Sequence, residues 1–225
     1  MFGLDDQIAS LSGGATFAVV CLVAIALGLR HASDPDHLTA VTTLVAGDRE
    51  RGVRRARRLG LAWGAGHATS LFVFGVPIVL SASYLPAPVQ MAAEAAVGVI
   101  IVALAVRLLV RWRRGELGHR HVRRGRTRGQ AFAIGLVHGM GGSAGVGLLL
   151  LAGIHDHAEA LAALALFAAC TALSMAIAST SFGFVLSRDA VAARYLTVVP
   201  VIGAASLAFG AWYALGAIHA VPYVL

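Results

Sequence analysis

The sequence contains no lysine and no asparagine, and charged residues of every kind are scarce. They make up 13% of its 225 residues, whereas hydrophobic residues make up 58%, and the mean hydropathy is +0.79. A soluble domain carries about 25% charged residues, so this composition indicates an integral membrane protein whose main partner is the lipid bilayer. Because no linker or low-complexity stretch divides the chain, we expect one transmembrane domain over residues 1–225.

Several apolar stretches approach the length of about 20 residues that crosses a bilayer. They cover residues 15–47, 59–80, 89–110, 130–152, 158–186 and 196–221. The first stretch is too long for one regular span, and it contains Pro35, which lacks the N–H for the helical hydrogen bond to His31. We therefore predict an all-α integral membrane protein with six transmembrane helices, the first of them broken near Pro35.

The arginines are distributed unevenly among the predicted loops. They follow the first, third and fifth spans, at residues 49–58, 113–128 and 188–194, whereas residues 84–88 and 153–159 contain none. Basic loops stay in the cytoplasm, so we expect all three basic loops on the cytoplasmic side and both termini outside the cell. The membrane that we expect is the cytoplasmic membrane of a prokaryote. The net charge of +7 is then a topology signal, and no separate soluble module is left to bind nucleic acid.

A short motif occurs twice, as Gly28-Leu-Arg-His31 and as Gly135-Leu-Val-His138, 107 residues further on. The same offset brings the second span onto the fifth and the third onto the sixth. Because each unit has three spans, the second unit enters the membrane from the opposite side, which makes an inverted repeat. Many secondary transporters have such a repeat, and their binding sites lie on broken helices at the interface of the two halves. We expect the halves at residues 1–112 and 130–225, joined by a basic cytoplasmic loop.

Cysteine is also scarce, with Cys21 and Cys170 alone. A disulfide-exchanging electron carrier with this symmetry needs cysteines at equivalent positions of the two halves. The equivalent of Cys21 is Arg128, which argues against such a carrier. We expect both cysteines to be small buried residues.

Residues 30–37, Arg-His-Ala-Ser-Asp-Pro-Asp-His, place ionisable side chains inside the first span. Each costs at least about 2.5–3.5 kcal/mol at membrane depth, so together they indicate a functional site. Imidazole nitrogens and carboxylate oxygens suit Ni, Co or Zn better than Mg or Ca. In an unbroken helix His31, Asp34 and His37 share one face and Asp36 points away, so the choice between Asp34 and Asp36 as ligand depends on the break. The alternative is that these groups only pair with one another inside the bundle.

Two further histidines lie at a similar depth. His67 and His138 stand about as many residues from the cytoplasmic ends of their spans as His37, roughly 12–15 Å deep, so the three can converge. Each alone is more typical of a buried hydrogen-bonding residue. Gly60 and Gly64, shortly before His67, form a small-xxx-small pair that lets another helix approach closely.

Other polar residues carry weaker signals. The hydroxyls of the fifth span are either pore-lining groups or interhelical hydrogen-bond donors. The pair His155 and His157 can capture metal outside the membrane or form a solvated turn. The pair His119 and His121 lies in an arginine-rich loop that disfavours cations. The fifth-span candidates are Ser174, Met175, Ser179, Thr180 and Ser181.

These motifs resemble the nickel/cobalt transporter family. Residues 30–37 are similar to its signature, a histidine followed after four residues by Asp-His; residues 60–70 resemble its second signature, and residues 135–143 its shorter, urease-associated permease branch. The resemblance implies a permease that carries Ni(II) or Co(II) as substrate at high affinity and low capacity. It implies transport roles for His31, Asp36 and His37, and for His67 in the second motif.

The chain departs from better-known members of that family, many of which have eight spans and a further acidic signature in the second half. The metal preference and the direction of transport therefore stay open, because an efflux branch exists. An intramembrane metalloenzyme is the main alternative: Asp34 is available as a general base, although the His-Glu-x-x-His motif of zinc proteases is absent. Haem ligation by the histidines is a further alternative.

We predict a secondary transporter and no enzyme, without a prosthetic group, with metal ligands among His31, Asp34, Asp36, His37, His67 and His138. The coupling ion and the oligomeric state stay open, and a homo-oligomer is compatible with this reading.

Overall fold

The computed structural model describes residues 17–46, 52–81, 86–117, 127–141, 154 and 156–222, and within them it is entirely helical. The helices are α2 (Phe17–His31), α3 (Pro35–Ala46), α4 (Gly52–Ser81), α5 (Ala87–Arg113), α6 (Arg128–His138), α8 (His157–Ser187), α9 (Asp189–Ala193) and α10 (Tyr195–Ala217). The expectation of an all-α membrane protein is confirmed at this level.

Four described helices, α4, α5, α8 and α10, are long and apolar enough to cross a membrane, and α2 and α3 pass the same test together as a bent pair, either a broken span or a re-entrant loop. The pair α2 and α3 is bent by 47° at a short break just before Pro35, as the proline predicted. Of the predicted span 130–152 the described part ends at residue 141, so the count of six stays a prediction.

The helix that contains the second predicted span begins before that span does. Helix α4 begins at Gly52, several residues before the apolar stretch, and its first turns carry Arg54, Arg55, Arg57 and Arg58. Arginine is among the better helix formers, so the helix continues past the apolar region into the basic segment that we expected to be a loop.

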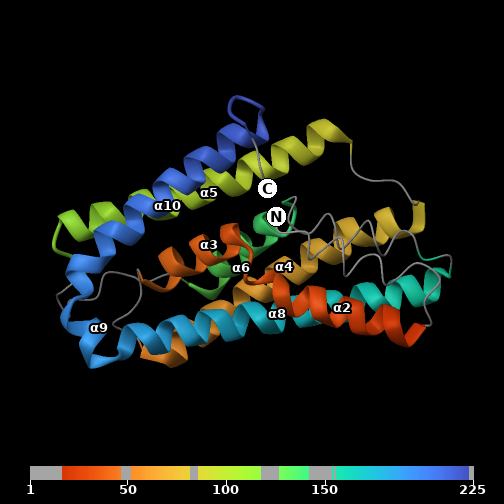
Figure 1. Ribbon diagram of the computed structural model, residues 1–225, viewed down its shortest axis with the longest axis horizontal. Helices are drawn as coiled ribbons and strands as arrows, with labels where there is room; N and C mark the ends of the chain where they lie inside the picture. The colour runs from red at the N-terminus through yellow and green to blue at the C-terminus, as the bar shows by residue number, and fades with distance from the viewer. Residues whose placement is uncertain are drawn as a thin grey trace.

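The helices form two groups with a pair of short helices between them (Figure 1). Helices α5 and α10 lie side by side; α8 packs against both α2 and α4. Helices α3 and α6 lie between the groups, where α3 contacts α5, α8 and α10, and α6 contacts α4 and α5. The four helices that carry His31, His37, His67 and His138, namely α2, α3, α4 and α6, thus come together in the middle of the molecule.

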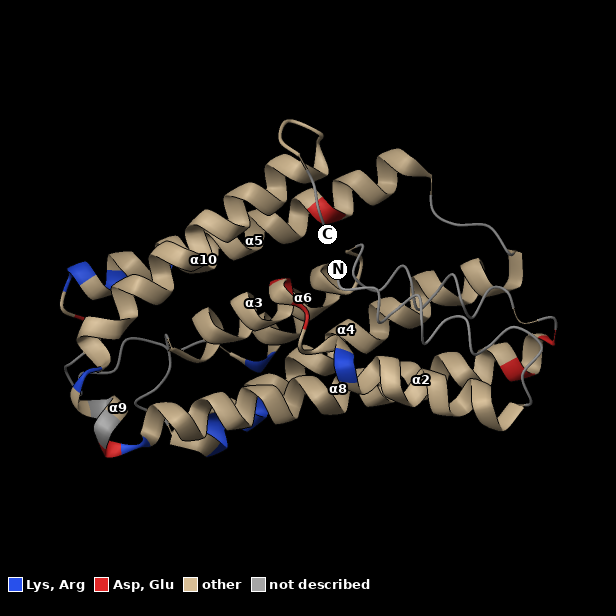
Figure 2. Ribbon diagram, in the orientation of Figure 1, with Lys and Arg blue, Asp and Glu red and all other residues tan. Residues whose placement is uncertain are grey.

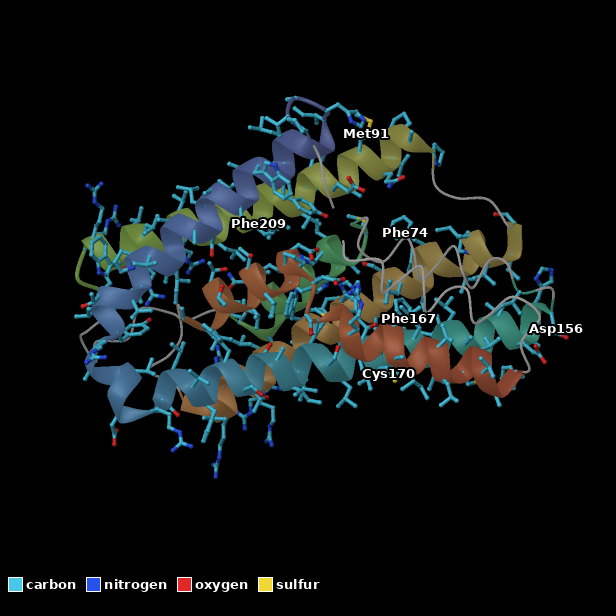
Figure 3. All side chains as sticks on the ribbon, viewed as in Figure 1. Phe74, Met91, Asp156, Phe167, Cys170 and Phe209 are labelled. Atoms are coloured by element: carbon cyan, nitrogen blue, oxygen red, sulfur yellow. The ribbon has the colours of Figure 1, made fainter. Side chains whose placement is uncertain are left out.

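Charge is sorted along the long axis. Arginines gather at the end where α4 and α10 begin and α5 and α8 end, next to α9 (Figure 2). Asp156, which caps the start of α8, lies at the opposite end (Figure 3). At the arginine-rich end the Tyr195 hydroxyl donates a hydrogen bond to the Ala46 carbonyl, which joins α10 to α3.

Helices α4 and α6 approach each other through glycine. A Cβ atom built on Gly66 would lie 2.0 Å from the Phe132 carbonyl oxygen, and one built on Gly135 would lie 2.0 Å from the Trp63 carbonyl oxygen. No other residue fits at either position without a shift of the backbone. Because His67 and His138 follow these glycines along their helices, the close crossing brings the two imidazoles into one region.

Candidate metal centre

The break in the first span positions both aspartates. Asp34 is the last residue before α3, where its carbonyl accepts the first helical hydrogen bond from Leu38 N (2.9 Å). Pro35 then occupies the first helical position, where a missing N–H costs nothing. Because α3 leaves at an angle from α2, Asp36 lies beside His37 (3.1 Å) and His138 (3.3 Å). Asp34 and Asp36 are each only 2% exposed.

Histidines from α2, α3, α4 and α6 converge at this break. His31, His37, His67 and His138 are each no more than 3% exposed. His37 lies at the centre, with its ring centroid 4.4 Å from His31, 4.5 Å from His138 and 5.0 Å from His67. The convergence that the common depth predicted is therefore present, and His31 joins it as well.

The side chains form two overlapping groups of three with the geometry of a metal site. His31, His37 and His67 form one group, and Asp36, His37 and His138 form the other; in each, one ligand atom per residue lies within 4.8 Å of the others. Ligands bound at about 2.0–2.2 Å around a transition metal stand roughly 3–4 Å apart, so only a small contraction is needed. His37 is common to both groups.

Several nitrogens in these groups lack hydrogen bonds. His37 Nε2, His67 Nδ1 and both ring nitrogens of His138 are buried without a partner among the described residues. His138 Nε2 lies 3.3 Å from Asp36 Oδ2, but the angles are not those of a hydrogen bond. A buried polar atom without a partner costs about 1–3 kcal/mol. A bound cation would satisfy the one lone pair of each neutral imidazole, whose other nitrogen carries a proton.

Asp34 is placed as a support for His31. Its Oδ1 accepts a hydrogen bond from Arg30 (3.2 Å), and its Oδ2 lies 3.2 Å from His31 Nδ1. This Oδ2 makes no hydrogen bond among the described residues, but a carboxylate so near an imidazole favours a proton on the adjacent nitrogen and leaves the other nitrogen for a metal. That other nitrogen, His31 Nε2, faces His67 Nε2 at 3.0 Å.

Two aromatic rings border the imidazoles. The Trp63 ring, buried at 1% exposure, lies 5.8 Å from the His37 ring and 5.7 Å from the His138 ring, and Phe167 lies 5.9 Å from His31. Trp63 was not among the site residues predicted from the sequence. Its spacing of four residues before His67, which places both on one helix face, was the available signal.

Comparison with known proteins gives one informative relative. No family model matches the sequence, and no solved structure matches it. The chain is 28% identical over 221 residues to the urease accessory protein UreH of Bacillus sp. (strain TB-90), and the match covers 92% of each chain. The similarity is therefore to a protein of about the same length along nearly all of it.

Of the remaining polar candidates, Ser174 joins two helices, His157 is exposed, and others lie outside the described residues. The Ser174 hydroxyl donates to the Gly28 carbonyl (3.0 Å), an interhelical hydrogen bond between α8 and α2. His157 is exposed at the start of α8. The cysteines, expected to be buried, are only half-buried, because the outer helix faces that carry them are not fully covered. His119, His121, Ser143 and His155 lie outside the described residues.

Proposed function

We propose that this protein is a secondary transporter that carries a divalent transition-metal cation, Ni(II) or Co(II), into the cell across the cytoplasmic membrane. The observation that carries the proposal is the pair of buried ligand groups that share His37 at the break of a membrane span. Imidazole and carboxylate together suit these metals. Broken helices with polar side chains at mid-membrane are typical of transporter sites.

The relative supports nickel as the cargo. Its name ties it to urease, an enzyme that needs nickel, and a membrane protein that serves such an enzyme has an evident task in supplying the metal. Residues 30–37 and 60–70, which resemble the signatures of nickel/cobalt transporters, contribute His31, His37 and His67 to the ligand groups. Cobalt remains part of the proposal because the same donor set accepts it.

Pairwise packing supports the inverted repeat of residues 1–112 and 130–225. Gly28 of α2 packs closely against Cys170 of α8, and Gly135 of α6 packs closely against Trp63 of α4. The two pairs are related by the same 107-residue offset, since 28 corresponds to 135 and 63 to 170. Transport would then proceed by rocking of the halves around the imidazoles, with the arginine-rich end in the cytoplasm and both termini outside.

Uptake of radioactive nickel into proteoliposomes and cells tests the proposal. We expect saturable uptake by the wild type and none by His37→Ala at an equal amount of inserted protein, because this change removes a ligand from both groups. His219→Asn, which replaces an exposed histidine at the end of α10, is the matched control and should transport normally.

Two results would contradict the proposal. One is the absence of net metal flux in the wild type, which together with metal-dependent turnover of a substrate would favour a metalloenzyme. The other is unchanged uptake by His37→Ala. Metal release from loaded vesicles distinguishes uptake from efflux. Only an exporter in its native orientation would move the metal away from the arginine-rich face, which we expect on the cytoplasmic side.

A further inference from the structure

A buried stripe runs along α5 and faces the neighbouring helices. Its residues recur at the helical spacing of three and four that defines one face. They are Glu94, Val97, Gly98, Ile101, Leu104, Ala105 and Leu108. All but Glu94 are apolar, and Glu94, at 7% exposure, is covered nearly as well as they are.

The surroundings of Glu94 supply little compensation for its charge. The amide of Gln90, one turn earlier on α5, donates a hydrogen bond to Oε1 (3.1 Å). Within the described ranges, no basic side chain lies at ion-pair distance from Glu94. The carboxylate stands about 10 Å inside the start of α5 at 1.5 Å per residue. An acid at membrane depth with only a neutral partner indicates a functional role.

Contacts of α5 connect this position with the imidazoles. One turn further along the stripe, Val97 Cγ2 would lie 3.1 Å from a Cβ atom built on Gly141, and the same Cβ would lie 3.3 Å from the His138 carbonyl oxygen. Val97 therefore packs against the segment that directly follows His138. Glu94 lies one turn from that contact, on the side away from the arginines at the end of α5.

The charge distribution indicates the end of the molecule from which a cation approaches Glu94. The arginines lie at one end of the molecule, and the acidic start of α8, with Asp156 and Glu159, lies at the other (Figure 2). A cation that comes from the acidic end would reach Glu94 on the near side of the contact between Val97 and the segment after His138, because Glu94 lies on the side of that contact away from the arginines. A carboxylate alone binds a divalent cation weakly, whereas three ligands that include imidazole bind it more tightly, so transfer toward the imidazoles is downhill.

We propose that Glu94 is an outer cation-binding residue, which receives the incoming divalent cation and passes it to the group formed by Asp36, His37 and His138. This inference rests on the proposed transport function. It assigns Glu94 to the capture of cargo, and it leaves the binding at the imidazoles and the movement of the halves to other residues.

Initial rates of nickel uptake over a range of nickel concentrations test this role. We expect Glu94→Gln, which keeps the shape and the contact with Gln90, to raise KM about tenfold, the effect of some 1.4 kcal/mol, with Vmax nearly unchanged. Glu94→Asp should restore much of the affinity. Glu159→Gln removes a negative charge from the same end of the molecule outside the stripe and should leave KM unchanged.

The possible outcomes separate the two levels of the proposal. If the wild type does not transport nickel, the proposed function fails. If the wild type transports and Glu94→Gln has the wild-type KM, or has a lower Vmax at unchanged KM, the outer cation-binding role is wrong. The amount and thermal stability of each variant in detergent, measured in parallel, identify a purely structural effect, which would also overturn the inference.

Discussion

The Nε2 atoms of His31 and His67 lie 3.0 Å apart, although 36 residues separate them in the chain. Two imidazole lone pairs cannot face each other at this distance, so one nitrogen must carry a proton or both must share a cation. Because His31 Nδ1 lies 3.2 Å from the Asp34 carboxylate, whose negative charge favours a proton there, we assign the proton of neutral His31 to Nδ1. His67 Nε2 is then the donor, and its buried Nδ1 is a bare lone pair.

This pairing predicts that metal binding moves a proton within His67 and releases none. A cation bound between His31 and His67 through their Nε2 atoms must displace the proton on His67 Nε2, and the bare lone pair of Nδ1 accepts it, because a neutral imidazole carries one proton on either nitrogen. Ligands that are already neutral release no proton, so we expect about zero protons per metal at neutral pH. Calorimetric titration in buffers with different ionisation enthalpies measures this number. Binding heats that change with the buffer would contradict the assignment of two neutral imidazoles.

Acid should weaken transport. Protons compete with the metal for the imidazole nitrogens, so a fall in pH favours the protonated side chains and lowers the apparent affinity. We expect uptake to decrease as the external pH falls from about 7.5 to 5, where an ordinary histidine titrates. Initial rates at fixed free nickel concentration check this, and constant rates across the range would argue against histidine ligation.

The shared position of His37 predicts how single substitutions differ. His31→Ala disrupts one ligand group and His138→Ala the other, whereas His37→Ala disrupts both. We expect each of the first two to weaken Co(II) binding about tenfold or more, at 1.4 kcal/mol per factor of ten, and the combined change to match His37→Ala. The visible absorption of bound Co(II) measures binding directly. If His138→Ala binds like the wild type, the second group plays no part in binding.

The sequence predicts this region in outline because its signals are local. Pro35 indicates the break, the ionisable side chains at membrane depth indicate the site, and the apolar stretches indicate the long helices. The sequence left open whether Asp34 or Asp36 is a ligand, because the helical spacing of side chains holds only within one unbroken helix. The angle between α2 and α3 decides where Asp36 points, and that angle depends on packing between helices distant in sequence.

Trp63 and Glu94 show the limit of such signals. A tryptophan in an apolar stretch has no special meaning until its neighbours are known. Glu94 lies only about five residues inside the predicted start of its span at residue 89, where an acid can still reach the water at the interface. The contact of Trp63 with His37 and His138 depends on the glycine crossing of α4 and α6. The burial of Glu94 depends on which face of α5 turns inward. Both are tertiary properties that the spacing of residues along the chain does not contain.

Trp63 offers a direct optical test of metal binding. The centroid of its ring lies 5.8 Å from that of His37 and 5.7 Å from that of His138. A paramagnetic Ni(II) or Co(II) ion held by these histidines should therefore quench its fluorescence. In a variant with Trp112→Phe and Trp212→Phe, only Trp63 emits among the tryptophans. We expect saturable quenching by Co(II), and none after the further change His37→Ala. Equal quenching with His37→Ala would place the ion elsewhere.

The glycine crossing predicts a stability difference within one short helix. In Gly135→Ala the new methyl group would lie 2.0 Å from the Trp63 carbonyl oxygen, so α4 and α6 must separate, at a cost of roughly 1–3 kcal/mol or more. Gly129→Ala, also in α6, meets only Thr127 Oγ1 at 3.9 Å and improves helix propensity. We expect a clear fall of the melting temperature in detergent for the first variant and none for the second. Because the same separation moves His67 away from His138, Gly135→Ala should also lose nickel uptake, and a variant with wild-type stability and uptake would show that α4 and α6 do not cross at this glycine.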